Sequence, residues 1–301
     1  MKDWLVQLLR DPVDGSALRL EGEKLVSAAG RTYPIVRGIP RFVPSDSYAG
    51  SFGYQWNRFA QTQLDSASGG TQSKDTFVEK TGLKLEDLRG KTVLDVGCGM
   101  GRFAEVVAEA GGRLVGIDLS SAVDAAAPNL ARFENAAVVQ ADVFSLPFAP
   151  ETFDLIYSIG VLHHTPDTRA AFLSLPRFLK PGGEIAVWLY ARMLRWTLAM
   201  SRVYRLITTR LPKDRLLKLC RVADPLGAFE RSGKVGTLVQ FLIPVSNHPD
   251  PKWRILDTFD WYSPRYQWTH TDLEVEGWFR EAGLQRIWHG SFPVSVRGAK
   301  I

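Results

Sequence analysis

Strand-like and helix-like patterns alternate five times between residues 75 and 190 of this chain. Short continuous apolar runs predict buried strands, and apolar positions that recur every three to four residues predict helices between them. Strands are expected at 92–96, 113–118, 136–142, 153–158 and 183–190, and helices at 77–88, 101–110, 122–134 and 168–179, the third broken by Pro128. This alternation predicts an α/β fold with a doubly wound, mostly parallel sheet covered on both faces, although the order of the strands cannot be read from it.

The flanking segments follow other patterns. Residues 1–50 combine short strand-like runs with turn formers and predict a small N-terminal β module. In the linker 51–74, aromatic residues at Phe52, Trp56 and Phe59 fall on one face of a predicted helix, and the Ser/Gly-rich stretch 66–73 is expected to be a flexible joint. Residues 191–271 form a helical insert after the fifth strand, and 272–301 add a helix and two strands, which brings the predicted sheet to seven strands.

Composition narrows the class of protein. The 301 residues are 45% hydrophobic and 23% charged, as in a globular enzyme, and no apolar run approaches the length of a membrane span or a secretion signal. Cys98 and Cys220 supply neither a disulfide framework nor a paired metal site. We therefore expect a cytoplasmic protein without a structural metal ion.

The strongest chemical signal is the glycine-rich turn after the first core strand, VLDVGCGMG at 93–101. Glycines at 97 and 99 let a ligand approach the backbone closely, and the helix that follows offers free N–H groups. Asp118 and Asp142 close the next two strands, where carboxylates can meet ribose hydroxyls and an adenine edge. Three strand ends that converge on one crevice predict a nucleotide-like ligand.

In order and spacing, five segments resemble the motifs of the class I S-adenosylmethionine-dependent methyltransferases: VLDVGCGMG, GIDLS, ADVFSLPF, FDLIYSIGVLHH and LKPGGEIAVWLY. The resemblance spans about residues 75–190 and implies a Rossmann-like fold with S-adenosylmethionine as cofactor. It implies that Gly97, Cys98 and Gly99, with Asp95 before them, line the methionine moiety and that Arg102 pairs with its carboxylate. It also implies contacts of Asp118 and Leu119 with the ribose, of Asp142 and Val143 with the adenine, and of Ser158 and Ile159 with the sulfonium.

The N-terminal segments carry a second resemblance. RTYPIVRGIPRF at 31–42 is similar to a small zinc-ribbon-derived module that precedes many bacterial methyltransferases, but Arg10–Gly15 has no cysteine where that module carries its knuckle. The segment from Phe52 is similar to one that closes over the cofactor, so Tyr54, Gln55 and Gln63 are candidate contacts. The alternative is a helix that only packs its aromatic side chains on the core.

His163 and His164 follow the fourth strand at the expected mouth of the acceptor site. An imidazole accepts a proton near neutral pH, so either histidine, with His163 preferred, is a candidate general base. The alternative is that the pair only hydrogen-bonds a loop. An Asp/Asn-Pro-Pro-aromatic motif, common in enzymes that methylate exocyclic or amide nitrogens, is replaced here by residues 158–161, which disfavours that chemistry.

Specificity is expected in the insert. Trp196, Met200, Val203 and Ile207 recur at helical spacing, with arginines elsewhere around the helix, which indicates an amphipathic basic helix. It is interpreted as a lid, a contact for a membrane or lipid-linked acceptor, a homodimer contact, or a plain cap on the sheet. Candidate substrate-binding residues, drawn from the fifth strand, this helix and the aromatic stretch 260–270, are Tyr190, Arg195, Tyr262, Arg265 and His270.

The charge distribution refines the choice of partner. The formal charge of +5 arises because residues 191–221 hold nine basic residues against Asp214 alone, while the rest has 28 basic against 31 acidic. A charge confined to one insert favours an anionic acceptor or surface over general nucleic-acid binding.

We expect a methyltransferase for a small-molecule oxygen or carbon acceptor in saccharide, lipid-linked or secondary metabolism. The alternatives are an RNA methyltransferase and a non-catalytic S-adenosylmethionine-binding partner protein.

Overall fold

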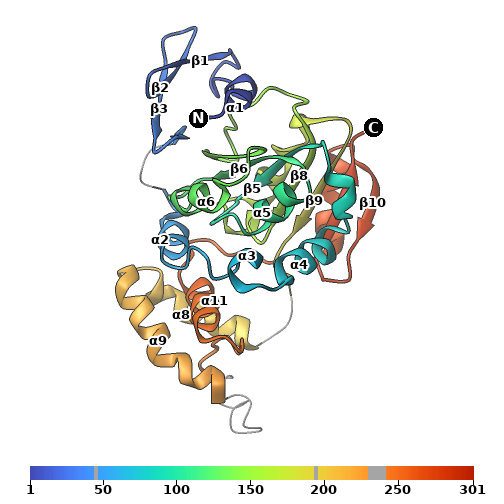
Figure 1. The fold of residues 1–301 in the computed structure, drawn as a ribbon. Coiled ribbons are helices and arrows are strands. Elements are labelled where there is room, and N and C mark those ends of the chain that lie inside the picture. Colours follow the sequence, from blue (N-terminus) through green and yellow to red (C-terminus); the bar gives the residue numbers. More distant parts are fainter. Residues whose placement is uncertain (44–46, 193–195, 230–241) are drawn as a thin grey trace.

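A seven-stranded sheet forms the centre of the computed structural model, which describes residues 1–43, 47–192, 196–229 and 242–301 (Figure 1). The strand order is β10-β11-β9-β8-β5-β6-β7. Strand β11 runs antiparallel to the other six strands, which all point the same way, so the predicted mostly parallel sheet is confirmed. The strands are β5 (Thr92–Val96), β6 (Arg113–Asp118), β7 (Ala136–Gln140), β8 (Phe153–Ile159), β9 (Leu179–Trp188), β10 (Gln285–His289) and β11 (Ser295–Ala299).

Both faces of the sheet are covered by helices, because its strands are apolar on both sides. One core cluster joins the sheet to α4 (Gln72–Thr81), α5 (Arg102–Glu109) and α6 (Val123–Leu130), and the other joins it to α7 (Thr168–Leu173) and α12 (Asp272–Glu281). Short 3-10 turns lie at η1 (Leu85–Leu88), η2 (Leu162–His164) and η3 (Pro176–Phe178). The strand order reverses between β5 and β8, which places a crevice at their carboxyl ends.

The segment expected to be a flexible joint is built into the fold. Asp65, in the short helix α3 (Asp65–Ser68), accepts hydrogen bonds from the backbone N–H groups of Ser73 (2.8 Å) and Lys74 (3.0 Å). This carboxylate satisfies the first free N–H groups of α4, so the helix begins at Gln72 rather than Phe77 and ends before η1. Pro128 does not break α6, which continues through it to Leu130.

The N-terminal module is a four-stranded antiparallel sheet that lies at the top of the molecule in Figure 1. It is anchored on the sheet edge, where the Phe42 N–H donates to the Gln140 carbonyl of β7 (2.8 Å). The Asp11 carboxylate accepts hydrogen bonds from Arg31 Nε (2.7 Å) and Tyr33 Oη (2.8 Å), so an ion pair and a phenol fix its first loop. The relation of this module to zinc ribbons stays a prediction. Its elements are α1 (Asp3–Leu8), β1 (Leu18–Glu21), β2 (Lys24–Ser27), β3 (Thr32–Val36) and β4 (Ile39–Pro40).

The insert after β9 lies at the opposite end of the molecule, with α2 (Gly50–Arg58) between it and the sheet (Figure 1). It contains α8 (Trp196–Thr208), α9 (Lys213–Phe229) and α11 (Pro251–Tyr262). Leu216, Leu217 and Cys220 of α9 pack with Phe259 and Tyr262 of α11 in a core of their own. Among the described residues, no helix combines the length and apolarity that crossing a bilayer requires.

Candidate active site

A cleft of about 490 Å³ opens at the carboxyl ends of the parallel strands. Its floor is formed by residues that follow β5, β6, β7 and β8, including the glycine-rich turn, Asp118, Asp142 and Gly160. Its walls come from α2 and α4, and α11 of the insert closes it from above. The crevice expected where the strand order reverses therefore exists, and three helices enclose it.

The turn after β5 fits the floor only because Gly97 and Gly99 lack side chains. Gly97 has a φ of +82°, and a Cβ placed on it would lie 2.2 Å from Cγ1 of Val161. A Cβ on Gly99 would lie 3.0 Å from Nε1 of Trp56, a residue of α2 that covers the turn. The backbone is therefore exposed to the cleft at close range, as binding of a nucleotide-like ligand requires.

The carboxylate of Asp118 lies at the end of β6, on the floor of the cleft. It accepts hydrogen bonds from the N–H of Gly99 (3.0 Å) and from the N–H (2.8 Å) and Oγ (2.6 Å) of Ser120. Burial raises its pKa, and these hydrogen bonds act in the opposite direction. Leu119, Asp142 and Val143 line the same part of the cleft. The second and third strand ends thus converge as the sequence predicts.

Arg102, the first residue of α5, is a buried cation held by neutral groups. Its Nε donates to Ser73 Oγ (3.0 Å), and its terminal nitrogens approach Gln63 Oε1 and Thr76 Oγ1 at 3.5 Å each. Burial lowers its pKa to about 10, and the carboxylates of Asp257 and Asp65 act from a distance without a hydrogen bond to it. Within the described residues this guanidinium has no carboxylate partner, so it can bind one from a ligand.

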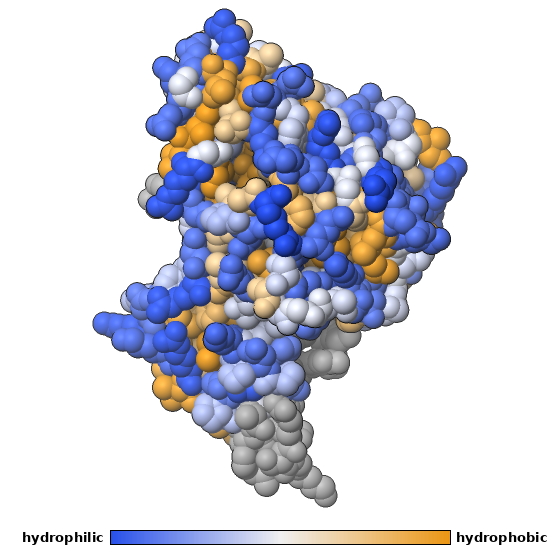
Figure 2. Space-filling view, viewed as in Figure 1, coloured by the Kyte–Doolittle hydropathy of each residue, from blue (hydrophilic) through white to orange (hydrophobic). Residues whose placement is uncertain are grey.

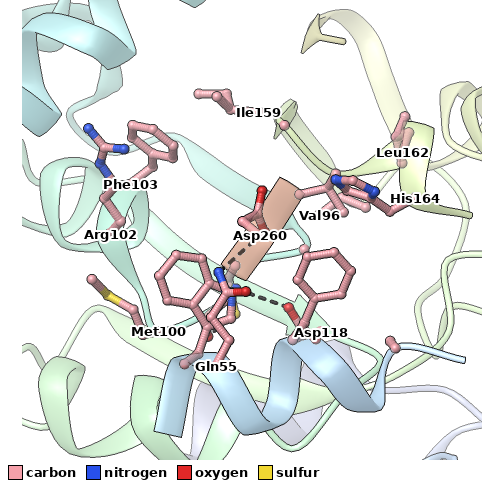
Figure 3. Close-up of a pocket in the computed structure, with 18 of the residues that line it drawn as sticks. Gln55, Val96, Met100, Arg102, Phe103, Asp118, Ile159, Leu162, His164 and Asp260 are labelled. Carbon is pink, nitrogen blue, oxygen red and sulfur yellow. Dashed lines mark hydrogen bonds between the residues drawn. The ribbon is translucent and has the colours of Figure 1, made fainter. Parts of the chain in front are cut away.

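A stripe of α11 forms the roof of the cleft. Trp253, Leu256, Asp257, Asp260 and Trp261 recur at intervals of three and four, so they share one face of the helix, and all five line the cleft. Asp260 accepts a hydrogen bond from Gln55 Nε2 of α2 (Figure 3) and another from the Tyr190 hydroxyl, each 3.2 Å long. Burial raises the pKa of Asp257 to about 7. The insert therefore contributes two carboxylates and two indoles to the site.

The two adjacent histidines have different surroundings. His164 lines the cleft, and its Nδ1 hydrogen-bonds the carbonyl of Tyr266 at 2.8 Å. Because a carbonyl only accepts, this bond places the proton on Nδ1 and leaves the lone pair on Nε2. Burial lowers the pKa of His164, which keeps the ring neutral.

His163 does not line the cleft. It is fully buried, its ring lies 3.9 Å from the ring of Tyr190, and neither ring nitrogen has a hydrogen-bond partner within the described structure. Burial lowers the pKa of His163 well below its usual value. Of the two predicted catalytic histidines, only His164 can reach a ligand in this arrangement.

The cleft brings together most of the predicted cofactor contacts. Those that line it are Gly97, Cys98, Gly99, Arg102, Asp118, Leu119, Asp142, Val143, Ile159, Gln55 and Gln63. Asp95 and Ser158 lie beneath the floor instead: burial raises the pKa of Asp95 to about 8, and the Ser158 hydroxyl donates to the Val96 carbonyl at 2.9 Å. Tyr54 points toward the insert, where its hydroxyl donates to Asp214 at 2.5 Å.

The predicted substrate residues are more scattered. Tyr190 lines the cleft, whereas the Tyr262 hydroxyl donates to the Pro244 carbonyl at 2.5 Å inside the insert. Arg265 is exposed beside Tyr266, and the ring of His270 is 3.1 Å from the Glu274 carboxylate. Arg195 lies outside the described residues. These roles stay predictions, and only Tyr190 is placed to touch a ligand in the cleft.

Several lining residues were not predicted from the sequence. Asp257 and Asp260 carry a readable signal, since two carboxylates three apart alternate with Trp253 and Trp261 on one helix face. Gln72, Thr76 and Lys80 line the cleft from α4 at four-residue spacing, which a face plot of that helix would have shown. Trp188, at the end of β9, offered no signal beyond its place in a strand. In the part of the chain that is described, no cluster of three metal-binding side chains occurs.

Residues 94–187 match a sequence family described as "Methyltransferase domain". Phosphoethanolamine N-methyltransferase 1 of Triticum aestivum is 32% identical over 160 residues, covering 52% of this chain and 31% of the relative. Ubiquinone biosynthesis O-methyltransferase of Pseudomonas paraeruginosa is 36% identical over 101 residues, covering 33% of this chain and 44% of the relative. The chain therefore spans less than half the length of either of these curated relatives.

Among solved structures, magnesium protoporphyrin IX methyltransferase from Synechocystis PCC 6803, with bound SAH, is 17% identical. That comparison covers 84% of this chain and 97% of the other, with a TM-score of 0.47. The family match covers β5 to β9 apart from a few residues at either end, which are the strands whose carboxyl ends form the floor of the cleft. The central part of this chain is therefore similar to methyltransferase domains, in agreement with the resemblance that the sequence carries.

Proposed function

We propose that this protein transfers a methyl group from S-adenosylmethionine to an oxygen or carbon atom of a small molecule bound under α11. One observation carries the proposal. The cleft combines a turn that has no side chain at Gly97 and Gly99 with a buried guanidinium, Arg102, whose hydrogen-bond partners are neutral. A zwitterionic amino-acid moiety next to a nucleoside supplies the carboxylate that this cation lacks.

The residues present fit the cofactor. Gly97 and Gly99 would receive the methionine moiety, Arg102 its carboxylate, and Asp118 the ribose hydroxyls. Asp142 and Val143 would border the adenine, and Ile159 the sulfonium. When bound, S-adenosylmethionine supplies a methyl group made electrophilic by a positively charged sulfur.

The chain itself positions the acceptor and handles its proton. Gln55, Asp260 and Tyr190 form one hydrogen-bonded group that ties α2 and α11 over the cleft. Displacement at carbon needs donor and acceptor in line, and a fixed roof over the cleft would hold the acceptor in that geometry. His164, with its free lone pair on Nε2, would accept the proton of a hydroxyl acceptor.

The lining also indicates the kind of acceptor. Phe52, Trp188, Trp253, Trp261 and Phe292 supply aromatic walls, while the carboxylates of α11 can accept hydrogen bonds from hydroxyl groups. A ring that bears hydroxyls, either a saccharide or a phenol, suits this mixture. The two curated relatives named above are described as acting on phosphoethanolamine and in ubiquinone biosynthesis, both of which are small-molecule chemistries.

We also infer that the insert docks on an anionic lipid surface. Val203, Leu206 and Ile207 of α8 are 55%, 64% and 67% exposed, and Leu219 and Val222 of α9 are 54% and 78% exposed. Figure 2 shows apolar side chains among charged ones on this part of the molecule. Exposed cations, which anionic lipid headgroups would neutralise, accompany them on these two helices and in the turn between them: Arg202, Arg210, Arg215, Lys218 and Arg221.

Transfer of labelled methyl groups tests the proposed function. The protein is incubated with S-adenosylmethionine carrying a ¹⁴C-methyl group and with either a small-molecule extract or total RNA. We expect label in the small-molecule fraction and none in RNA. Label confined to RNA would overturn the acceptor class, because the proposal places the acceptor in an enclosed cleft.

A further inference from the structure

Lys80 projects into the cleft from the last turn of α4. It follows Gln72 and Thr76 at four-residue spacing, so the three side chains form one row along the wall. Its Nζ lies 3.1 Å from the ring centroid of Trp188, at the end of β9, and 5.5 Å from that of Phe292. The ammonium group is thus set between two aromatic rings, which favours the charged form.

No acidic group of the described structure neutralises this cation. Neither Asp257 nor Asp260 is among the charges that influence Lys80; those charges are Arg102, which disfavours its charged form, and Glu79, which favours it. Glu79 is exposed at the adjacent position of α4 rather than in the cleft. Burial lowers the pKa of Lys80 to about 7. A ligand that brings a negative charge to this point would restore the charged form and gain an ion pair.

The cofactor has one carboxylate, and the cleft has two cations without a carboxylate partner. Arg102 directly follows the glycine-rich turn, so it is placed for the methionine carboxylate. Lys80 lies one helical turn beyond Thr76, the residue that Arg102 approaches at 3.5 Å, and borders the ends of β8 and β9 instead. There a Cβ on Gly160 would lie 3.2 Å from Cζ3 of Trp188, so Trp188 and Lys80 lie beside the end of β8, where Ile159 would border the sulfonium.

We propose that Lys80 binds an anionic group of the methyl acceptor, so that the acceptor is a carboxylate or phosphate whose ring or chain packs on Trp188 and Phe292. This rests on the proposed function, because it assigns the cofactor carboxylate to Arg102. Lys80 is then a specificity-determining residue that selects the acceptor by charge.

The charge of Lys80 can be read directly by NMR. Reductive methylation with ¹³C-formaldehyde labels every lysine and retains its charge, and Lys80→Arg identifies the Lys80 signal by its loss. The signal is titrated with pH in the free protein and with saturating S-adenosylmethionine. Each titration is repeated with 4-hydroxybenzoate, with inorganic phosphate, and with the neutral analogue 4-hydroxybenzyl alcohol. We expect 4-hydroxybenzoate or phosphate to raise the pKa of Lys80 by about one unit, and the neutral analogue to leave it unchanged.

Binding of the same probes gives the second readout. Lys80→Met should weaken binding of whichever anion raises the pKa of Lys80 at least tenfold (about 1.4 kcal/mol). The affinity of this variant for S-adenosylhomocysteine should stay within twofold of the affinity of the unmodified chain. Lys84→Met, at an exposed lysine 3.8 Å from Glu86, is the matched control and should change neither affinity.

Three results would overturn the proposal: a rise in the pKa of Lys80 caused by S-adenosylmethionine alone, equal effects of the charged and neutral probes, or no effect of either anion. The first would assign Lys80 to the cofactor. Failure of the proposed function is a separate result, because it appears as absent cofactor binding while the anion titrations in the free protein are still measured.

Discussion

The hydroxyl of Tyr190, just beyond β9, donates a 3.2 Å hydrogen bond to Asp260 of α11. The other oxygen of the same carboxylate accepts from Gln55 of α2, also at 3.2 Å. One side chain therefore joins the central sheet, the helix that precedes the domain, and the insert that follows it. Since all three residues line the cleft, this contact fixes the roof relative to the floor.

Asp260→Ala should loosen that roof. The change leaves the buried amide of Gln55 and the half-buried hydroxyl of Tyr190 without their acceptor, at a cost of about 1–3 kcal/mol each. Tyr190→Phe loses one hydrogen bond, about 1 kcal/mol. We expect faster proteolysis within residues 191–271 and a higher KM for the acceptor, with the larger effects in Asp260→Ala. Limited proteolysis and steady-state kinetics measure both. If Asp260→Ala and the unmodified chain are cleaved at equal rates in limited proteolysis, the contact does not hold the insert in place.

His164→Gln should remove the acid limb of the pH profile. Burial lowers the pKa of His164, and the neutral ring is the form that accepts a proton, so kcat should rise through that lowered pKa and be level at neutral pH. With a hydroxyl acceptor, the variant should lose about 10²–10⁴-fold in kcat. His163→Phe is the comparison, because it preserves a ring against Tyr190 and should retain the limb. Loss of the acid limb in His163→Phe, with its retention in His164→Gln, would assign the general base to His163 instead of His164.

Gly97→Ala should cost far more than a positive φ alone. The φ of Gly97 is +82°, and the added Cβ would also meet Val161 at 2.2 Å. Gly90→Ala is the matched control, because its φ is +75° with open space around it. We expect a loss of about 1 kcal/mol for Gly90→Ala and a further 1–3 kcal/mol from overpacking for Gly97→Ala. Chemical denaturation gives both values, and equal losses would mean that the turn accommodates a side chain.

Replacing Val203, Leu206 and Ile207 together by serine should reduce binding to anionic vesicles. The substitutions remove exposed apolar side chains of α8 while leaving its charge unchanged. Co-sedimentation with phosphatidylglycerol vesicles should fall at least tenfold, and high salt should weaken binding of the unmodified chain. Leu273→Ser, at an 82% exposed leucine of α12, serves as control. Equal binding to neutral phosphatidylcholine vesicles would argue against recognition of an anionic surface.

Much of the fold was predictable because its strands are buried on both faces and therefore form continuous apolar runs. Strands β5 and β6 match the predicted limits to the residue. The start of α4 was misplaced because its cap is Asp65, which lies seven residues before the helix and looked like part of a polar linker. The order of the strands depends on long-range pairing, which periodicity does not encode.

The floor of the site was likewise predictable, since its residues follow strands whose ends were visible. The roof was not, because Asp257 and Asp260 reach the cleft only through the packing of α11 on α2 and α9. Arg205 shows the same limit. The spacing predicts an apolar face with Val203 and Ile207 and arginines elsewhere around the helix. In the structure Arg205 donates to Gln267 Oε1 (2.7 Å) and the Pro264 carbonyl (2.6 Å), while Val203 and Ile207 are exposed.

Calorimetric titration of the protein with S-adenosylhomocysteine tests the central claim most directly. We expect saturable 1:1 binding with a Kd in the micromolar range, a binding free energy of about −8 kcal/mol. Arg102→Met should weaken it at least tenfold, because it removes the cation assigned to the ligand carboxylate. Absence of binding at millimolar ligand, or unchanged affinity in Arg102→Met, would contradict the account.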